Sequence, residues 1–398
     1  MTDASTVPDR DSVPAPAARW RTNLALFIAT VASVVVTGVY MQGPAEGAPP
    51  WRESFAAALH PLGALSRGAQ FAGTILVILV AHELGHYVMA RVHKVDASLP
   101  YFIPLPILSP FGTMGAVIRM RGVIPTRRAL LDIGASGPLA GLCFAIPLYI
   151  YGAAHSHLVP ITAPGDGAIQ LGESILMKIL DHVFAPAKPA GMDLELSPIA
   201  FGAWGGLFVT MINLIPVGQL DGGHVAYALF GPKQDRYAQL IHRAMLAFFF
   251  VNVIGHVFRD FSGGFGLYYL GRHIANSLFW LVWFQMLAIL GTLASKNRED
   301  REEKPGTLTV RTRLVATVGL VVVGSIARDN RSALLPLAFF AGLAMLVTME
   351  VRGGVLRRHD LLDHPATAAA PLDRGRAVVA VVTLVIFVLL FMPEPFGM

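Results

Sequence analysis

FAGTILVILVAHELGHYVMA, residues 71–90, predicts an apolar helix that carries two imidazoles and a carboxylate. His82 and His86 are four residues apart, so on a helix they lie about 40° apart on one face, close enough to share a metal ion. Imidazole nitrogens are common zinc ligands, and Glu83 beside them can act as a general base. Because an ionised group in hydrocarbon costs about 2.5–3.5 kcal/mol, its presence predicts function. The alternative is a polar cluster that only packs two helices together.

The composition departs from that of a soluble domain. The 398 residues are 54% hydrophobic and 14% charged, whereas soluble domains are about 45–50% apolar and about 25% charged. The apolar residues occur in runs long enough to cross the roughly 30 Å hydrocarbon layer as helices. We expect an all-α polytopic membrane protein, a multi-span helical bundle. The expected spans cover 23–41, 70–92, 129–153, 198–217, 236–258, 274–294, 314–327, 332–351 and 376–392.

The segments between these spans differ in character. Residues 1–22 predict a disordered tail, and 42–69 a near-neutral loop. Residues 96–128 are apolar but broken by prolines and glycines, which excludes a continuous helix and predicts a membrane-associated β-hairpin or re-entrant segment. A plain surface loop is the alternative. Residues 154–197 predict a polar loop, and 295–306 a solvated linker.

The charges indicate an orientation rather than a nucleic-acid partner. The net charge of +5 comes from basic residues in short connections between apolar runs, as the positive-inside rule predicts. The clearest group lies at or between the facing ends of the second and third spans: Arg91, Lys94, Arg119, Arg121, Arg127 and Arg128. We therefore expect 93–128 and the N-terminus to be cytosolic. Cys143 is the single cysteine, so an intrachain disulfide is excluded. Because it lies inside an apolar run, we expect it to be a small residue of the core.

A second motif, NLIPVGQLDGGH at 213–224, supplies a third candidate ligand. Two histidines leave a catalytic zinc one protein ligand short, and Asp221 is the best carboxylate for that position. It follows an apolar span in a glycine-rich break that would let the backbone bend close to the metal. An aspartate in a surface turn is the alternative. Asn213 either hydrogen-bonds to substrate backbone or satisfies a neighbouring helix, and His224 is not assigned as a ligand.

These motifs together carry a family resemblance. HExxH in one span and NxxPxxxLDG in a later one resemble the site-2 protease family of intramembrane zinc metalloproteases. The resemblance covers residues 70–230 and extends to FGTMGA at 111–116, similar to the family's membrane-associated hairpin, and GASGPLAG at 134–141, similar to its glycine-rich third core helix. The chain looks most like the short relatives without PDZ or CBS domains. Its expected parts are then a tail, a first span with its loop, a catalytic core and additional spans, over 1–22, 23–69, 70–230 and 231–398.

The resemblance implies a role for each site residue. His82, His86 and Asp221 would bind one Zn²⁺ per chain, Glu83 would be the catalytic base, and Asn213 would contact substrate. The implied function is an intramembrane zinc metalloendopeptidase that cleaves transmembrane segments of membrane proteins, as in regulated intramembrane proteolysis. The expected partners are a transmembrane protein substrate and the lipid bilayer, with no nucleic acid. We expect an integral, multi-pass protein of the cell (inner) membrane.

Two rival functions use the same residues. A membrane-tethered zinc peptidase with a soluble active site would need a globular domain around HELGH, but the flanking residues are apolar. A transporter or ion-binding protein would not require a glutamate beside the first histidine.

Overall fold

The computed structural model describes residues 20–41, 61–106, 109–121, 124–160, 170–296, 308–329, 332–358, 361–364, 367 and 370–397. Most of the expected tail 1–22, the stretch 42–60 and most of the expected linker 295–306 lie outside these residues. Where the ends of these segments are described, they are helical, since α1 begins at Trp20 and α9 ends at Lys296.

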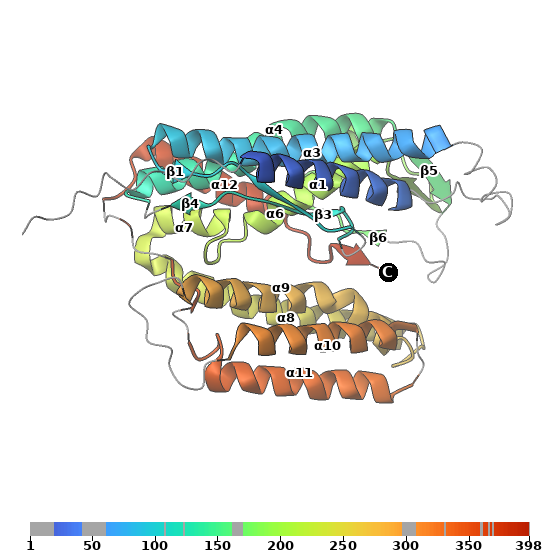
Figure 1. Ribbon diagram of the computed structural model, residues 1–398. Coiled ribbons are helices and arrows are strands. Elements are labelled where there is room, and N and C mark those ends of the chain that lie inside the picture. Colours follow the sequence, from blue (N-terminus) through green and yellow to red (C-terminus); the bar gives the residue numbers. More distant parts are fainter. Residues whose placement is uncertain are drawn as a thin grey trace, which may run out of the picture.

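The helices form two layers, and the last helix of the chain returns to the first layer (Figure 1). The first layer contains α1 (Trp20–Met41), α3 (Pro61–Val92), α4 (Arg127–Ala154), α6 (Pro198–Asn213), α7 (Asp221–Phe230) and α12 (Arg374–Leu390). The second layer contains α8 (Gln234–Ser262), α9 (Leu270–Lys296), α10 (Val310–Asp329) and α11 (Leu334–Gly353). A short 3₁₀ turn, Gly231–Lys233, joins α7 to α8 at the edge of the two layers.

The polytopic helical fold is confirmed. Within the described part of the chain, seven helical stretches are long and apolar enough to cross a membrane: Trp20–Tyr40, Gly63–Val92, Arg127–Ala154, Asp221–Ser262, Leu270–Leu293, Val310–Arg328 and Leu334–Gly353. Two expected spans, 198–217 and 376–392, are shorter helices of 16 and 17 residues. The expected loop over 61–69 is wrong, because α3 begins at Pro61 and these residues form its first turns.

The predicted hairpin is present and runs deep along α1. Strand β2 (Tyr101–Pro104) pairs with β3 (Thr113–Val117), and β1 (Asp96–Ala97) pairs with β4 (Met120–Arg121), both antiparallel. At the base, Asn23 Nδ2 donates to the carbonyl of Pro100 at 2.8 Å; near the tip, Ser33 Oγ donates to that of Gly112 at 2.5 Å. Ten helical residues rise about 15 Å. The tip therefore lies well inside the length of a candidate membrane span, which favours the re-entrant interpretation over a surface loop.

Residues 154–197 are more structured than the expected polar loop. Strands β5 (His157–Pro160) and β7 (Met192–Glu195) pair antiparallel, and α5 (Ile175–Phe184) lies between them in the sequence, capped by Ser174. Strand β6 (Gln170–Leu171) pairs with β8 (Phe396–Gly397) at the end of the described chain. This last pairing joins segments more than two hundred residues apart, so hydropathy along the loop cannot reveal it.

Cys143 is exposed on α4, so the expectation of a small core residue is wrong. It lines a shallow apolar hollow with Val77 and Phe144. In a membrane-spanning helix the outward face is also apolar, because lipid rather than water surrounds it. Hydropathy around Cys143 therefore could not separate a buried position from a lipid-facing one.

Helix α4 runs antiparallel to both α3 and α6, and this arrangement places the two sequence motifs at the same end of the first layer. Gly152, near the end of α4, approaches Ala200, near the start of α6, while Gly134 near the start of α4 lies beside the backbone of Asp221. Asn213, at the end of α6, lies beside His82 in the second half of α3. The HELGH and LDG motifs therefore lie at the same end of the first layer.

Candidate metal centre

Three side chains from two distant motifs converge between α3 and α7. His82 Nε2 and His86 Nε2 each lie 3.2 Å from Asp221 Oδ2, and the two Nε2 atoms are 3.1 Å apart. His82 is 3% exposed, and the side chains of His86 and Asp221 are 13% and 15% exposed. Among the described residues, this is the one group of three or more histidines, cysteines and acids whose ligand atoms lie close enough to hold a metal ion.

The spacing and chemistry of this group fit zinc. Nitrogen and oxygen ligands lie about 2.0–2.1 Å from zinc, so two ligands of a tetrahedral site are about 3.3 Å apart. The three observed separations of 3.1–3.2 Å agree with that value. Two imidazoles and one carboxylate also form a donor set known for catalytic zinc, which leaves a coordination position for water or substrate.

The break between α6 and α7 places Asp221. Helix α6 ends at Asn213, and Pro216 two residues beyond the cap cannot continue it, because proline lacks the amide hydrogen. Helix α7 then starts at Asp221 itself, so the carboxylate lies at a helix N-terminus, where the helix dipole favours negative charge. A Cβ on Gly222 would lie 2.0 Å from the carbonyl oxygen of Leu214. Glycine at position 222 therefore allows α7 to approach the turn that precedes it closely.

Glu83 and Asn213 adjoin the three candidate ligands. Glu83 is buried on α3, and only 6% of its surface is exposed. Its carboxylate is close enough to interact electrostatically with His86 and Asp221. Asn213 Nδ2 lies 3.3 Å from His82 Nε2. All five residues singled out in the sequence are thus gathered at one place.

Helix α4 contributes to the centre with backbone rather than side chains. His86 Nδ1 donates a hydrogen bond to the carbonyl of Ile133 at 2.7 Å, which leaves Nε2 facing Asp221. Gly137 leaves room for the imidazole, since a Cβ there would lie 2.1 Å from His86 Nε2. Gly137 belongs to the GASGPLAG segment that carries part of the family resemblance, whereas no sequence pattern identified the Ile133 carbonyl.

His224 is placed near the centre without joining the ligand group. Its Nδ1 lies 2.7 Å from Nε2 of His364, whose ring stacks on Tyr227. The backbone amide of His364 donates to Asp235 at the start of α8. The segment before α12 therefore packs on the helix that carries Asp221, a contact between residues too far apart for motif analysis to predict.

The fold and the site define a class: a polytopic helical membrane protein with a buried His-His-Asp centre. Residues 70–252 match the model of peptidase family M50. This stretch, somewhat less than half of the chain, is therefore similar to that family, the site-2 protease family. The match includes both motifs and every residue of the candidate centre.

Curated relatives carry related names. The chain is 32% identical over 192 residues to "Probable zinc metalloprotease EGY2, chloroplastic" of Arabidopsis thaliana, which covers 46% of this chain and 33% of that protein. It is 29% identical over 242 residues to "Probable zinc metalloprotease EGY1, chloroplastic" of the same plant, covering 55% of this chain and 42% of that protein. The chain thus spans less than half the length of these relatives. No solved structure is significantly similar to it.

Gly137→Ala should weaken zinc binding, because the added methyl group occupies the position of the His86 ring. We expect zinc affinity, measured by competition with a chelator, to fall at least about tenfold. Gly319→Ala in α10 is the matched control, since a Cβ there meets nothing within 4 Å. Equal zinc affinity in the two variants would contradict the proposed position of His86 in the centre.

Proposed function

We propose that the protein is an intramembrane zinc metalloendopeptidase that cleaves transmembrane segments of membrane proteins. The observation that carries this proposal is the convergence of His82, His86 and Asp221 between helices apolar enough to span a membrane. The peptidase family M50 match and the zinc metalloprotease names of the relatives support the same reaction class. In this proposal His82, His86 and Asp221 bind one zinc ion.

Zinc, when bound, supplies Lewis-acid chemistry that makes water acidic enough to lose a proton near neutral pH and polarises a carbonyl. The chain's own residues would then move the proton and orient the substrate. Glu83, one residue after His82, takes the proton from the attacking water and delivers it to the departing amine. Asn213 holds the substrate backbone beside the centre. His82 and Glu83 are almost fully buried, and a site with little bulk water strengthens such electrostatic interactions.

A transmembrane substrate must lose helical structure before its peptide bond can be attacked, because its carbonyls are hydrogen-bonded within the helix. Strand β3 is suited to hold such an unwound segment. Among the described residues its only strand partner is β2, on one edge, and it also contacts α3. An extended peptide could pair with the other edge of β3, as in other cases of strand addition.

We also propose an orientation. The basic residues near the end of α3 and the start of α4 favour the cytosolic side of a cell (inner) membrane for this end of the first layer. The start of α1 lies at the same end, since Asn23 contacts the base of the hairpin that follows α3. The N-terminus would then be cytosolic, and cleavage would release a cytosolic product.

Purified protein should contain about one zinc ion per chain, and His82→Ala with His86→Ala should remove it. The double variant loses two of three ligands, so metal analysis should show a loss of nearly all bound zinc. His157→Ala with His182→Ala is the control, because both histidines are exposed and outside the centre. Undiminished zinc in the His82/His86 variant would exclude this metal site.

Glu83→Gln should retain zinc and fold but lose proteolysis, since glutamine keeps the shape of the side chain and cannot accept the proton. We expect cleavage of a reconstituted transmembrane substrate to fall by about 10²–10⁴-fold. Glu173→Gln, an exposed carboxylate at the opposite end of the first layer, should cleave normally. Near-normal cleavage by Glu83→Gln would overturn the assignment of the base.

A further inference from the structure

The orientation of His86 depends on one backbone carbonyl of α4. Nδ1 of His86 donates to the carbonyl of Ile133 at 2.7 Å, and this bond fixes which ring nitrogen faces Asp221. Hydrogen bonds of this kind hold the tautomer and ring plane of metal-binding histidines, and their loss typically costs about 10–100-fold in metal affinity. Whatever holds Ile133 in place therefore also acts on the centre.

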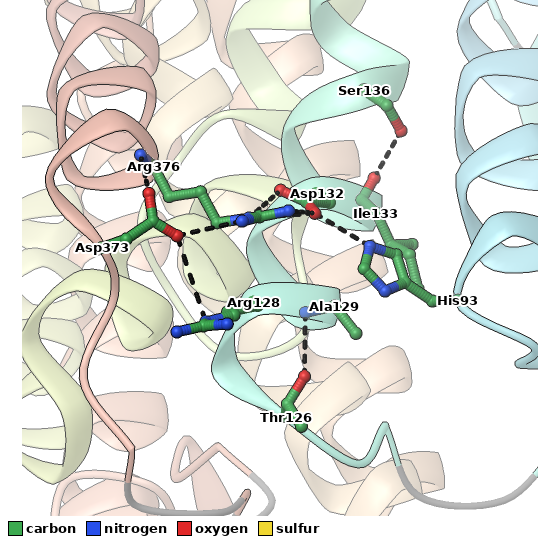
Figure 2. Close-up of polar contacts among 9 residues, drawn as sticks. All are labelled: His93, Thr126, Arg128, Ala129, Asp132, Ile133, Ser136, Asp373 and Arg376. Carbon is green, nitrogen blue, oxygen red and sulfur yellow. Dashed lines mark hydrogen bonds and ion pairs between the residues drawn. The ribbon is translucent and has the colours of Figure 1, made fainter.

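Asp132, the residue before Ile133, is held by an arginine and a histidine from different parts of the chain (Figure 2). Nε of Arg376 donates to the two carboxylate oxygens at 3.0 and 3.1 Å, and its Nη2 donates to Oδ2 at 2.8 Å. His93 Nε2 lies 2.8 Å from the same Oδ2. The Asp132 side chain is only 14% exposed. A forked arginine–carboxylate pair is among the stronger and more directional polar contacts in proteins.

This network joins three elements at the end of the first layer that holds the candidate centre. His93 directly follows α3, Asp132 is near the start of α4, and Arg376 lies in the first turn of α12. Arg376 also donates to Asp373, the residue that caps α12, at 2.9 Å. The network thus links α3, which carries His86, to α4, which supplies the acceptor carbonyl of Ile133. The link lies within about two helical turns of the His86–Ile133 bond.

We propose that Asp132, clamped by Arg376 and His93, is a positioning residue that sets the Ile133 carbonyl and through it the orientation of His86. The inference rests on the proposed zinc site. Through Arg376, helix α12 would then help to position a residue of the candidate centre. Arg128 differs from Arg376 in this respect: its side chain is 57% exposed, reaches only Asp373 at 4.0 Å, and does not contact Asp132 among the ion pairs of the described residues.

The test compares the melting temperature of the purified full-length protein with and without zinc. Asp132→Asn and Arg376→Gln should both reduce the rise in melting temperature that zinc causes, and should weaken zinc retention against a chelator by about tenfold. Combining the two changes should add little to either one, because they break the same network. Arg376→Lys keeps the positive charge but not the forked contact, so it should lose less zinc affinity than Arg376→Gln does. Arg128→Gln is the matched control and should behave as the unmodified chain.

The possible results separate the explanations. If Asp132→Asn lowers the melting temperature equally with and without zinc, the network only stabilises the fold and the positioning role is wrong. If Asp132→Asn retains zinc as tightly as Arg128→Gln does, the role is also wrong, while the zinc site itself stands. If zinc leaves the melting temperature of the unmodified chain unchanged, the proposed zinc site fails and the positioning role fails with it.

Discussion

The close packing of α3 against α4 is the constraint on which the candidate centre depends. A Cβ on Gly85 would lie 2.5 Å from the carbonyl oxygen of Ser136, and one on Gly137 would lie 2.1 Å from the His86 ring. With no side chain between the two backbones, His86 reaches the Ile133 carbonyl and presents its other nitrogen to Asp221. Small residues allow the same close approach between membrane helices in general, where van der Waals packing replaces the hydrophobic effect.

Segments far apart in the sequence pack around α3 and α4. Helix α12 comes after the whole second layer, yet it lies in the first layer beside α4 and α7 (Figure 1). It is tied at its start through Arg376 and beyond its end through β8, which pairs with β6. The second layer holds its own fully buried ion pair, between Arg313 and Glu350. A buried pair of this kind avoids leaving a single charge in an apolar interior.

The sequence predicted the features that depend on local pattern. Apolar runs predicted the helices, the HELGH spacing predicted two histidines on one face, and the LDG motif predicted the third member of the group. The prolines and glycines of 96–128 predicted a break in helix, which the structure resolves as a hairpin. Each of these follows from spacing of a few residues along the chain.

The features that sequence reasoning missed depend on contacts between distant segments. The Ile133 carbonyl is a backbone atom and has no residue signature. The links of Arg376 to Asp132 and of His364 to His224 join positions 244 and 140 residues apart. Cys143 was misplaced for another reason, because an apolar stretch in a membrane protein can face either protein or lipid. Hydropathy along one chain contains neither kind of information.

The position of the scissile bond tests the central claim most directly. The reconstituted protein would be supplied with a single-span substrate, and the ends of both products would be mapped by mass spectrometry, with Glu83→Gln as the blank. Intramembrane cleavage at the His82–Asp221 centre predicts cuts inside the apolar segment, near its cytosolic end, at small or helix-weakening residues. Such residues lower the cost of unwinding, since glycine costs a helix about 1 kcal/mol relative to alanine. Cuts confined to loops outside the apolar segment would contradict the account.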